Sequence, residues 1–373
     1  MATKMQYCYG LTKELPRDKI TDVFDRSLYN ELCQKHVKMN GKDLPHKYFS
    51  DARDIALGLS LDGVAPFKSR KQTAWPVILF NFNLPPEIRT HLEHILCYGV
   101  IPGPKSVKDV DSFLWPLYDE LVDLAKGVKT LDLQSHEFFN LHAYLLLAFG
   151  DIPAISKLMS MKGHNGYSPC QLCKIKGVKK LGETVHYVPL HQTNSSAYDP
   201  CNLPYRSHQE FIKQASEVLD APSDSASNAL TKEYGIKSLP FMSLLGSMDL
   251  PRSFPYDFMH LIFKNLIPNL VRHYTGDFKG LNCGVEDYQL PKSVWEAICE
   301  AGAWSGNTIP SCFGARIPNL ELERSNMTAE MWSFWAMYLG PALLKGKFLK
   351  PKYYKHFMKL VGLIHLCVTF ETK

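Results

Sequence analysis

Two aspartates in this chain each follow a run of apolar residues that reads as a buried strand. Asp62 comes directly after Ile55–Leu61, and Asp151 comes directly after Tyr144–Gly150. A carboxylate at the end of a core strand is held rigidly and still reaches solvent, so two of them from different strands can bind a divalent cation. A short helix and a Cys-x-x-Cys pair in a lysine-rich stretch follow the second aspartate. This order indicates metal-dependent chemistry on a polyanion, with nucleic acid as the leading candidate.

The lysines gather in two stretches that contain no acid. The 373 residues carry a mild net charge of +5, but Ile152–Gly182 holds six lysines and no acidic residue, and Met331–Phe370 does the same. Local basic faces of this kind suit phosphate backbones, although a run of lysines is more often a solvated surface.

The cysteines indicate an intracellular protein with reduced thiols. Ten cysteines include one close pair, Cys170 and Cys173, and show no disulfide-framework spacing. No apolar segment typical of a secretory signal follows Met1, and the longest apolar runs, Leu141–Phe149 and Val361–Phe370, are too short to cross a bilayer. We therefore expect no membrane partner, and a Cys-x-x-Cys pair in this setting favours zinc or redox chemistry over a structural disulfide.

Strand signals come early in the chain and helix signals dominate later. We expect strands over Ile55–Leu61, Trp75–Phe82, His94–Val100 and around Phe139–Phe149, and helices over Asp22–Val37, Val110–Lys126, Ala154–Met161, Tyr256–His273 and Met327–Leu344. Residues 163–255 are rich in Ser, Asn, Pro and His and read as a separate module of loops and short helices. The prediction is an α/β fold, with a mixed sheet flanked by helices and interrupted by this insertion.

The length predicts two or three structural units. We divide the chain into a polar N-terminal segment (1–50), the first part of a catalytic core (51–162), an insertion with the cysteine pair (163–255), a helical completion of the core (256–345) and a basic C-terminal helix (346–373).

Short motifs follow one another along the chain in a specific order. They are Tyr48-Phe-Ser-Asp-Ala-Arg-Asp-Ile-Ala-Leu-Gly-Leu-Ser-Leu-Asp-Gly-Val-Ala-Pro-Phe67, Trp75-Pro-Val-Ile-Leu79, Asn83-Leu-Pro-Pro-Glu-Ile-Arg89, Ile101-Pro-Gly-Pro-Lys105, Phe149-Gly-Asp-Ile-Pro-Ala154, Gly163-His-Asn-Gly166, Cys170-Gln-Leu-Cys173 and Tyr187-Val-Pro-Leu190. This series resembles the CACTA (En/Spm-like) family of DDE transposases, from about Asp25 to Leu344. The resemblance implies a ribonuclease-H-like core whose strand-borne aspartates, with a glutamate on a C-terminal helix, hold Mg²⁺ or Mn²⁺ for DNA cleavage.

The resemblance assigns the first two acids to Asp62 and Asp151 and the third to Glu330. Glu330 lies in the first turn of the helix predicted from Met327, and we prefer it to the nearby Glu321 and Glu323 because a packed helix positions a side chain better than a loop. Each assignment has a simpler alternative, in which the residue only stabilises the end of a helix. An aspartate such as Asp151 before Ile-Pro-Ala is often only a helix cap, and Glu330 is favoured in a first turn by the helix dipole alone.

Cys170 and Cys173 would need two further ligands to form a tetrahedral zinc site. The histidines nearest in sequence are His164, His186 and His191. The family carries an Asp-x-x-His element ahead of its glutamate, and here it is Asp257-Phe-Met-His260. The resemblance therefore makes His260 the candidate third ligand and Asp257 a weaker candidate, in a structural site. The alternative is that both cysteines are reduced thiols in a turn.

DNA is the partner that the resemblance implies. We select Lys162, Lys174, Lys176, Lys179 and Lys180, around the cysteine pair, as candidates for phosphate contacts. Transposases usually act as dimers or larger assemblies, so a homo-oligomer is expected, and the DNA substrate implies a nuclear location. The leading hypothesis is a transposase catalytic region. The alternative is an inactive or truncated derivative that only binds DNA or protein, because the chain begins close to the core and ends soon after the last helix.

Overall fold

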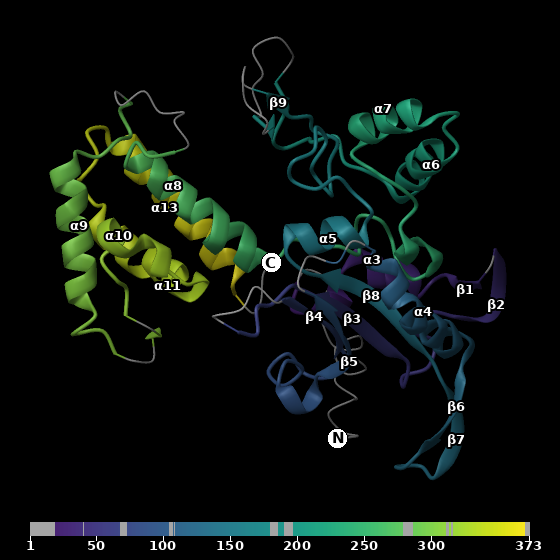
Figure 1. The fold of residues 1–373 in the computed structure, drawn as a ribbon. Helices are drawn as coiled ribbons and strands as arrows, with labels where there is room; N and C mark the ends of the chain where they lie inside the picture. Colours follow the sequence, from purple (N-terminus) through teal and green to yellow (C-terminus); the bar gives the residue numbers. More distant parts are fainter. Residues whose placement is uncertain are drawn as a thin grey trace. The chain divides into compact units, whose positions relative to one another are not determined.

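The computed structural model describes residues 19–39, 41–67, 73–103, 107, 109–179, 186–189, 197–278, 286–310, 313–314 and 316–369, with the backbone alone at 186–187. The chain divides into two compact units, Met1–Tyr256 and Asp257–Lys373 (Figure 1). Each unit is described by itself.

A mixed four-stranded sheet forms the centre of the first unit. Its spatial order is β5 (Leu96–Gly103), β4 (Thr73–Asn81), β3 (Ile55–Leu61) and β8 (Ala143–Phe149). The pairs β5–β4 and β4–β3 are antiparallel, and β8 runs parallel to β3. The predicted α/β class and mixed sheet are confirmed, and β3 has the predicted bounds. Strand β5 begins two residues after its predicted start at His94 and ends three residues after its predicted end at Val100, because an edge strand tolerates Pro102 without a backbone donor.

A helix and a hairpin connect β5 to β8. Helix α4 (Asp111–Lys126) begins one residue after its predicted start and ends where predicted. It buries Leu114, Leu117 and Leu121, which recur at helical spacing. The hairpin of β6 (Val128–Asp132) and β7 (Glu137–Leu141) then extends away from the sheet (Figure 1). The single strand predicted around Phe139–Phe149 is therefore wrong. The chain makes two strands there, since His142 leaves the hairpin and its imidazole is held by Asp54.

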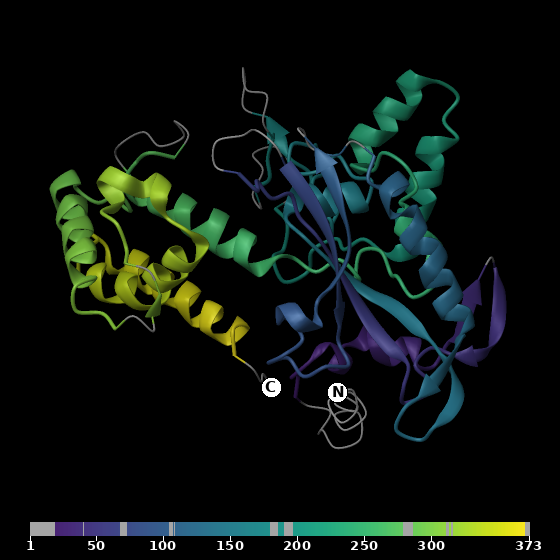
Figure 2. The same ribbon diagram turned by 60° about the horizontal axis from the view of Figure 1, so that its bottom comes forward.

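Apolar residues cover both faces of the sheet. One face packs against α4 and against α5 (Ile152–Leu158), which begins two residues before its predicted start. The other face packs against 3₁₀ helix η1 (Val23–Asp25), helix α3 (Ser27–Leu32) and the small hairpin β1 (His36–Met39) and β2 (Lys42–Lys47). The helix predicted over Asp22–Val37 is thus shorter than expected, because Val37 is buried in a strand. Figure 2 shows the sheet between these layers.

A β-bulge lies in the middle of β8. Leu57 pairs with Leu145 and the next residue, Gly58, pairs with Leu147, so Leu146 is an extra residue on β8. Because side chains alternate between the two faces of a strand, one extra residue reverses the alternation beyond it. Leu145 and Ala148 accordingly lie in one core cluster, and Leu146 and Leu147 both lie in the other.

The described residues of 163–255 fold against the sheet. They include the short strands β9 (Val178–Lys179) and β10 (His186–Tyr187), helices α6 (His208–Leu219) and α7 (Asp224–Tyr234), and 3₁₀ helix η3 (Phe241–Leu244). Apolar residues from this segment, among them Phe211, Ile236, Met248 and Phe254, belong to the same core cluster as β3 and α4. This part of the chain therefore shares a core with the sheet.

Among its described residues, the second unit contains helices and no strand. It comprises π-helix η4 (Met259–Leu266), α8 (Ile267–Tyr274), α9 (Lys292–Ser305), α10 (Leu320–Glu323), 3₁₀ helix η6 (Arg324–Asn326), α11 (Ala329–Phe334), π-helix η7 (Trp335–Leu339), α12 (Gly340–Leu343) and α13 (Pro351–Cys367). Its core gathers large aromatic side chains, including Trp295, Trp332, Trp335 and Phe357. Both helical regions predicted here are confirmed, and each contains a π-helical stretch.

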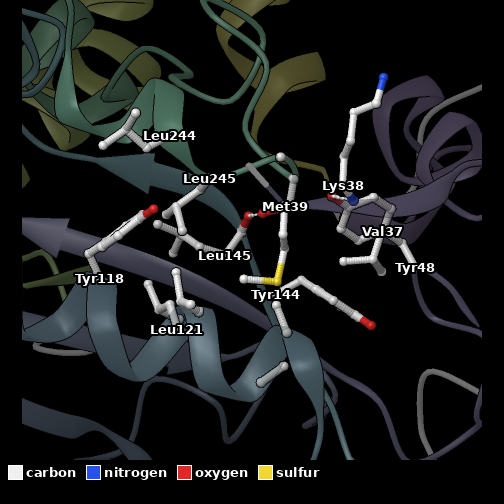
Figure 3. Close-up of a pocket in the computed structure, with 15 residues that line it drawn as sticks. Val37, Lys38, Met39, Tyr48, Tyr118, Leu121, Tyr144, Leu145, Leu244 and Leu245 are labelled. Carbon is white, nitrogen blue, oxygen red and sulfur yellow. Dashed lines mark hydrogen bonds between the residues drawn. The ribbon is translucent and has the colours of Figure 1, made fainter. Parts of the chain in front are cut away.

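A small cavity lies beside the sheet under Leu244–Ser247 (Figure 3). Its volume of about 30 Å³ suits a water molecule rather than a substrate. Most of its labelled lining is apolar, and the ammonium of Lys38 points away from it (Figure 3). We therefore treat this cavity as a packing gap.

Candidate catalytic and metal sites

Asp62 and Asp151 lie at the same edge of the sheet. Ser60 of β3 pairs with Phe149 of β8, and two residues beyond this pair come Asp62 and Asp151. Neighbouring strands lie about 4.8 Å apart, and parallel strands end at the same edge. The register therefore places these two predicted residues just beyond adjacent strand ends, and both side chains are half-buried.

The bulge at Leu146 sets this alignment. Asp54 and His142 precede β3 and β8 at matching positions, since Ile55 pairs with Ala143. Counted from Asp54 and His142, Asp62 is eight residues along one strand and Asp151 is nine along the other. The extra residue of β8 absorbs the difference of one. Without it, Gly150 would stand opposite Asp62, and Asp151 would point to the other face.

Gly150 permits the close approach of the two strand ends. A Cβ atom placed on Gly150 would lie 2.4 Å from the carbonyl oxygen of Leu61, the last residue of β3. Any larger residue would push the ends apart at the positions just before the two aspartates.

Backbone contacts on both sides hold Asp62. On the strand side, Leu61 pairs with Val77 of β4. On the loop side, Val64 and Ala74 exchange two backbone hydrogen bonds of 2.9 Å each. Between them, Gly63 packs so tightly on the Trp75 indole that a Cβ would lie 2.9 Å from the ring. Asp62 is thus positioned by a short, tightly packed connection.

Asp151 is also the N-cap of α5. Its Oδ1 accepts a hydrogen bond of 2.7 Å from the backbone N–H of Ala154, and its φ and ψ of −64° and 167° are extended. The simpler interpretation of Asp151 as a helix cap is therefore confirmed by its geometry. The cap fixes the carboxylate and uses one of its two oxygens, so the cap and a metal-binding role are compatible.

Glu330 lies in the second unit, in the first turn of α11. Thr328 caps this helix by accepting a hydrogen bond of 3.2 Å from the Met331 N–H. Glu330 is exposed, and its carboxylate lies against Gly314, where a Cβ would be 2.3 Å from Oε1. Gly314 has a φ of +93°, so both its conformation and this contact favour glycine.

The rival acids are engaged elsewhere in the second unit. The indole N–H of Trp295 donates to Glu321 Oε2 at 2.9 Å, and Asn326 Nδ2 donates to Glu323 Oε2 at 3.0 Å. Both glutamates lie on the short helix α10, so their expected placement in a loop is wrong. Glu321 ties α10 to α9 through its contact with Trp295.

Cys170 and Cys173 point their sulfurs at one another. The two Sγ atoms are 3.0 Å apart, the Cys173 N–H donates to Cys170 Sγ, and the Tyr256 hydroxyl lies 3.1 Å from the same sulfur. The hydrogen bond from Cys173 is the largest factor that lowers the pKa of Cys170, to about 5, and the same contact raises the pKa of Cys173. Cys170 is therefore the more readily deprotonated of the two, and thiolates are the form that binds soft cations.

His260 and Asp257 form a local pair at the start of the second unit. His260 Nδ1 lies 2.8 Å from Asp257 Oδ2, and the His260 N–H donates to Asp257 Oδ1 at 3.0 Å. A carboxylate on one ring nitrogen orients a histidine and leaves the other nitrogen for a ligand. Asp257 directly follows Tyr256, whose hydroxyl contacts Cys170. Asp257 therefore fits better as the partner of His260 than as a ligand.

Within each described part of the chain, no three His, Cys, Asp or Glu side chains are grouped so that they could hold a metal ion. Of the other histidines considered, His164 is exposed, the side chain of His186 is not described, and His191 lies outside the described residues.

The candidate lysines differ in their partners. Lys174 forms an ion pair with Glu210 at 2.9 Å, and Lys176 forms one with Glu233. Lys162 and Lys179 are exposed, and Lys180 lies outside the described residues. The glutamates are 36 and 57 residues away in sequence, so no local pattern indicated these pairs.

None of the helices that the structure describes is both long and apolar enough to span a lipid bilayer.

A family model settles what kind of protein this is. The model described as "Transposase family tnp2" matches residues 35–233, which is more than half of the chain and includes both Asp62 and Asp151. A search of curated proteins finds no match. The match agrees with the resemblance seen in the motifs and confirms it. The chain belongs to the tnp2 family of CACTA (En/Spm) transposases.

Proposed function

We propose that this chain is the catalytic region of a DDE-type DNA transposase, with Asp62, Asp151 and Glu330 as its three acids. The observation that carries the proposal is the register of β3 and β8, which sets two carboxylates at one edge of the sheet. Carboxylate oxygens are the ligands that Mg²⁺ and Mn²⁺ prefer. A cation bound at this edge would be held by acids from two neighbouring strands.

The strand order supports a ribonuclease-H-like core. Three antiparallel strands in sequence are followed by a helix, and the chain then returns to a fourth strand that is parallel to the first. This arrangement lets the first and fourth strands end together, which is what the first two acids of such a core require.

The chemistry would be phosphodiester hydrolysis at a transposon end, followed by in-line attack of the freed 3′-hydroxyl on target DNA. When bound, a pair of Mg²⁺ or Mn²⁺ ions would polarise the phosphate and assist both the attacking and the leaving oxygen. The hard carboxylate oxygens of Asp62, Asp151 and Glu330 suit these hard cations. The chain's own part is to hold its acids rigidly, through the α5 cap at Asp151 and the short connection after Asp62.

We further propose that Cys170 and Cys173 hold a structural Zn²⁺, with His260 as a third ligand oriented by Asp257. The convergent sulfurs and the low pKa of Cys170 suit this role. Elemental analysis tests it. Near-stoichiometric zinc in the wild-type chain, lost in Cys170→Ser and kept in Cys201→Ser, which changes an exposed cysteine, is expected. A zinc content near zero in the wild-type chain would contradict the assignment.

The proposed partners are transposon ends and target DNA, and the pairing of two ends makes a homo-oligomer the expected assembly. Action on chromosomal DNA implies a nuclear location.

The test of the catalytic proposal is a strand-cleavage assay on DNA with Mg²⁺ or Mn²⁺. The variants Asp62→Asn, Asp151→Asn and Glu330→Gln remove one charge each without a change of size. Glu323→Gln is the matched control, since it removes a carboxylate from an exposed position near α11.

We expect cleavage by the wild-type chain and by Glu323→Gln, and a loss of at least about a hundredfold in each of the other three, because even residues behind the metal ligands typically contribute that much. A wild-type chain without activity would support a DNA-binding derivative instead. Equal activity in all variants would remove these acids from the mechanism.

A further inference from the structure

A backbone bridge places two lysines from distant segments on one outer surface. Met161 and Ile236 pair as an antiparallel bridge, flanked by hydrogen bonds from the Lys162 N–H to the Gly235 carbonyl (2.8 Å) and from the Lys237 N–H to the Ser160 carbonyl (2.7 Å). Met161 and Ile236 are buried in the core of the first unit. Because adjacent side chains of extended backbone point to opposite faces, Lys162 and Lys237 both point outward. Diagonal positions of this kind lie about 7–8 Å apart.

A third lysine joins them from α5. Lys157 lies six residues after Asp151, about 9 Å along the helix axis. Its ammonium donates a hydrogen bond to the Val107 carbonyl and lies 6.0 Å from the centre of the Trp75 ring. The same indole packs against Gly63, directly after Asp62. Trp75 therefore connects this lysine to the edge that carries the two aspartates.

The charges of Lys157 and Lys162 act on Lys237, with little acidic compensation. Burial lowers the pKa of Lys237, and the charges of Lys157 and Lys162 lower it further. The acid that acts in the opposite direction is Asp111, whose own pKa is raised by burial and by Asp109. Among the described residues, none of the three lysines has an ion-pair partner within 4.0 Å. Repulsion between neighbouring positive charges destabilises the folded state, and a bound anion would relieve it. The cluster is therefore suited to an anionic ligand.

The neighbouring lysines of the same stretch behave differently. Lys174 and Lys176 are each neutralised by a glutamate, Glu210 and Glu233. Lysines of one segment can therefore be compared, because Lys174 and Lys176 are ion-paired with acids whereas Lys162 has no such partner among the described residues.

We propose that Lys157, Lys162 and Lys237 form a phosphate-binding face that holds a DNA backbone next to the Asp62 and Asp151 edge. This inference rests on the proposed DNA substrate and adds where the strand lies on the first unit. Lys157 and Lys237 were not among the candidates from sequence.

The experiment measures binding of the full chain to a labelled random-sequence 30-base-pair duplex by fluorescence anisotropy, across a salt series and without added Mg²⁺ or Mn²⁺. The test variant is Lys162→Gln/Lys237→Gln. The matched control is Lys174→Gln/Lys176→Gln, which removes the same formal charge. The variant Lys162→Arg/Lys237→Arg keeps the charge, and thermal unfolding of all four proteins verifies the fold.

We expect the plot of the logarithm of the association constant against the logarithm of the salt concentration to become shallower in the test variant. The magnitude of its negative slope should fall by about 1.8, since each lost phosphate contact removes about 0.9. Its affinity at 0.15 M salt should fall by on the order of tenfold or more, with an unchanged or higher melting temperature. The control and the arginine variant should keep the wild-type slope.

Equal losses in the test and control variants, or an unchanged slope in the test variant, would overturn the proposed face while leaving the catalytic proposal intact. A wild-type chain that does not bind DNA at all would overturn both. A wild-type chain that binds through these lysines but never cleaves would support the face and sink the catalytic proposal.

Discussion

Strands β3 and β8 carry polar side chains at matching positions at both of their ends. The two ends differ in how deeply these side chains are buried and in which group lies on the neighbouring strand. At the amino ends, Asp54 Oδ1 lies 3.0 Å from His142 Nδ1, and the Asp54 side chain is only 1% exposed. At the carboxyl ends, one half-buried aspartate follows each strand. One end joins an acid to a group that can complement it, whereas the other joins two acids.

We interpret this difference as one between a structural role at the amino ends and the proposed catalytic role at the carboxyl ends. Asn83 strengthens the amino end, since its Oδ1 accepts from the Ala56 N–H and its Nδ2 donates to the Asp54 carbonyl. That end is a satisfied buried network of the kind that specifies a fold. The carboxyl end instead carries the two carboxylates to which we assign the proposed metal ions.

The largest expected effect is on cleavage at the carboxyl end. Asp151→Asn should lower DNA cleavage on the order of a thousandfold or more, because bound ions contribute several kcal/mol to this chemistry. Asparagine caps helices as well as aspartate does, so α5 should stay formed. Metal-dependent cleavage and urea unfolding measured on the same protein check both statements. A stability loss as large as the activity loss would reduce Asp151 to its cap.

The amino end should show the reverse pattern. His142→Ala leaves Asp54 buried without its partner and should cost about 3 kcal/mol of unfolding free energy, measured by urea unfolding. His164→Ala, at an exposed histidine, is the control. Cleavage per folded molecule should stay near that of the wild-type chain. If His142→Ala abolished cleavage without a loss of stability, the contrast between the two ends would be wrong.

The same variant carries a pH dependence. Burial raises the pKa of Asp54, so its ionised form disfavours the folded state. Its contribution to stability is therefore greatest below its unfolded pKa of about 3.9, and it is lost as pH rises through the folded pKa. Removal of His142 raises that folded pKa further. The stability difference from the wild-type chain should narrow as pH falls toward about 4, and a constant difference would contradict this account.

A smaller effect should follow from changing the distance between the strand ends. Gly150→Ala places a Cβ against the Leu61 carbonyl and should lower cleavage by about tenfold or more, since small misplacements of reacting groups are costly. Gly99→Ala on β5 is the control, because its Cβ would meet no atom within 4 Å. Equal activities of the two variants would show that the spacing of the aspartates does not matter.

The cysteine pair sharpens the comparison as an intermediate case, in which two like groups share one proton. Alkylation of Cys170 by iodoacetamide, followed by mass spectrometry before any metal is added, should have a pH midpoint of about 5. Cys173→Ala should move the midpoint up, because it removes the hydrogen bond that stabilises the thiolate. An ordinary midpoint of about 8.5 in the wild-type chain would contradict the shared proton.

The sequence was informative where apolar runs are bounded by polar residues. Ile55–Leu61 ends in Asp62, and the helix of Asp111–Lys126 shows a regular apolar period, so both were predicted closely. The bulge was not predictable. Tyr144–Phe149 is apolar throughout, so no alternation reveals that Leu146 is the extra residue. The same limit applies to the lysines, since their free or paired state depends on residues far away in the chain.

Iron-directed cleavage of the polypeptide tests the central claim most directly. Fe²⁺ with ascorbate produces hydroxyl radicals where the metal binds, so the wild-type chain should be cut near both Asp62 and Asp151. Excess Mg²⁺ should suppress both cuts, and either Asp62→Asn or Asp151→Asn should abolish the two together. Cuts elsewhere only, or a cut at one aspartate that survives substitution of the other, would contradict a shared metal site at this edge of the sheet.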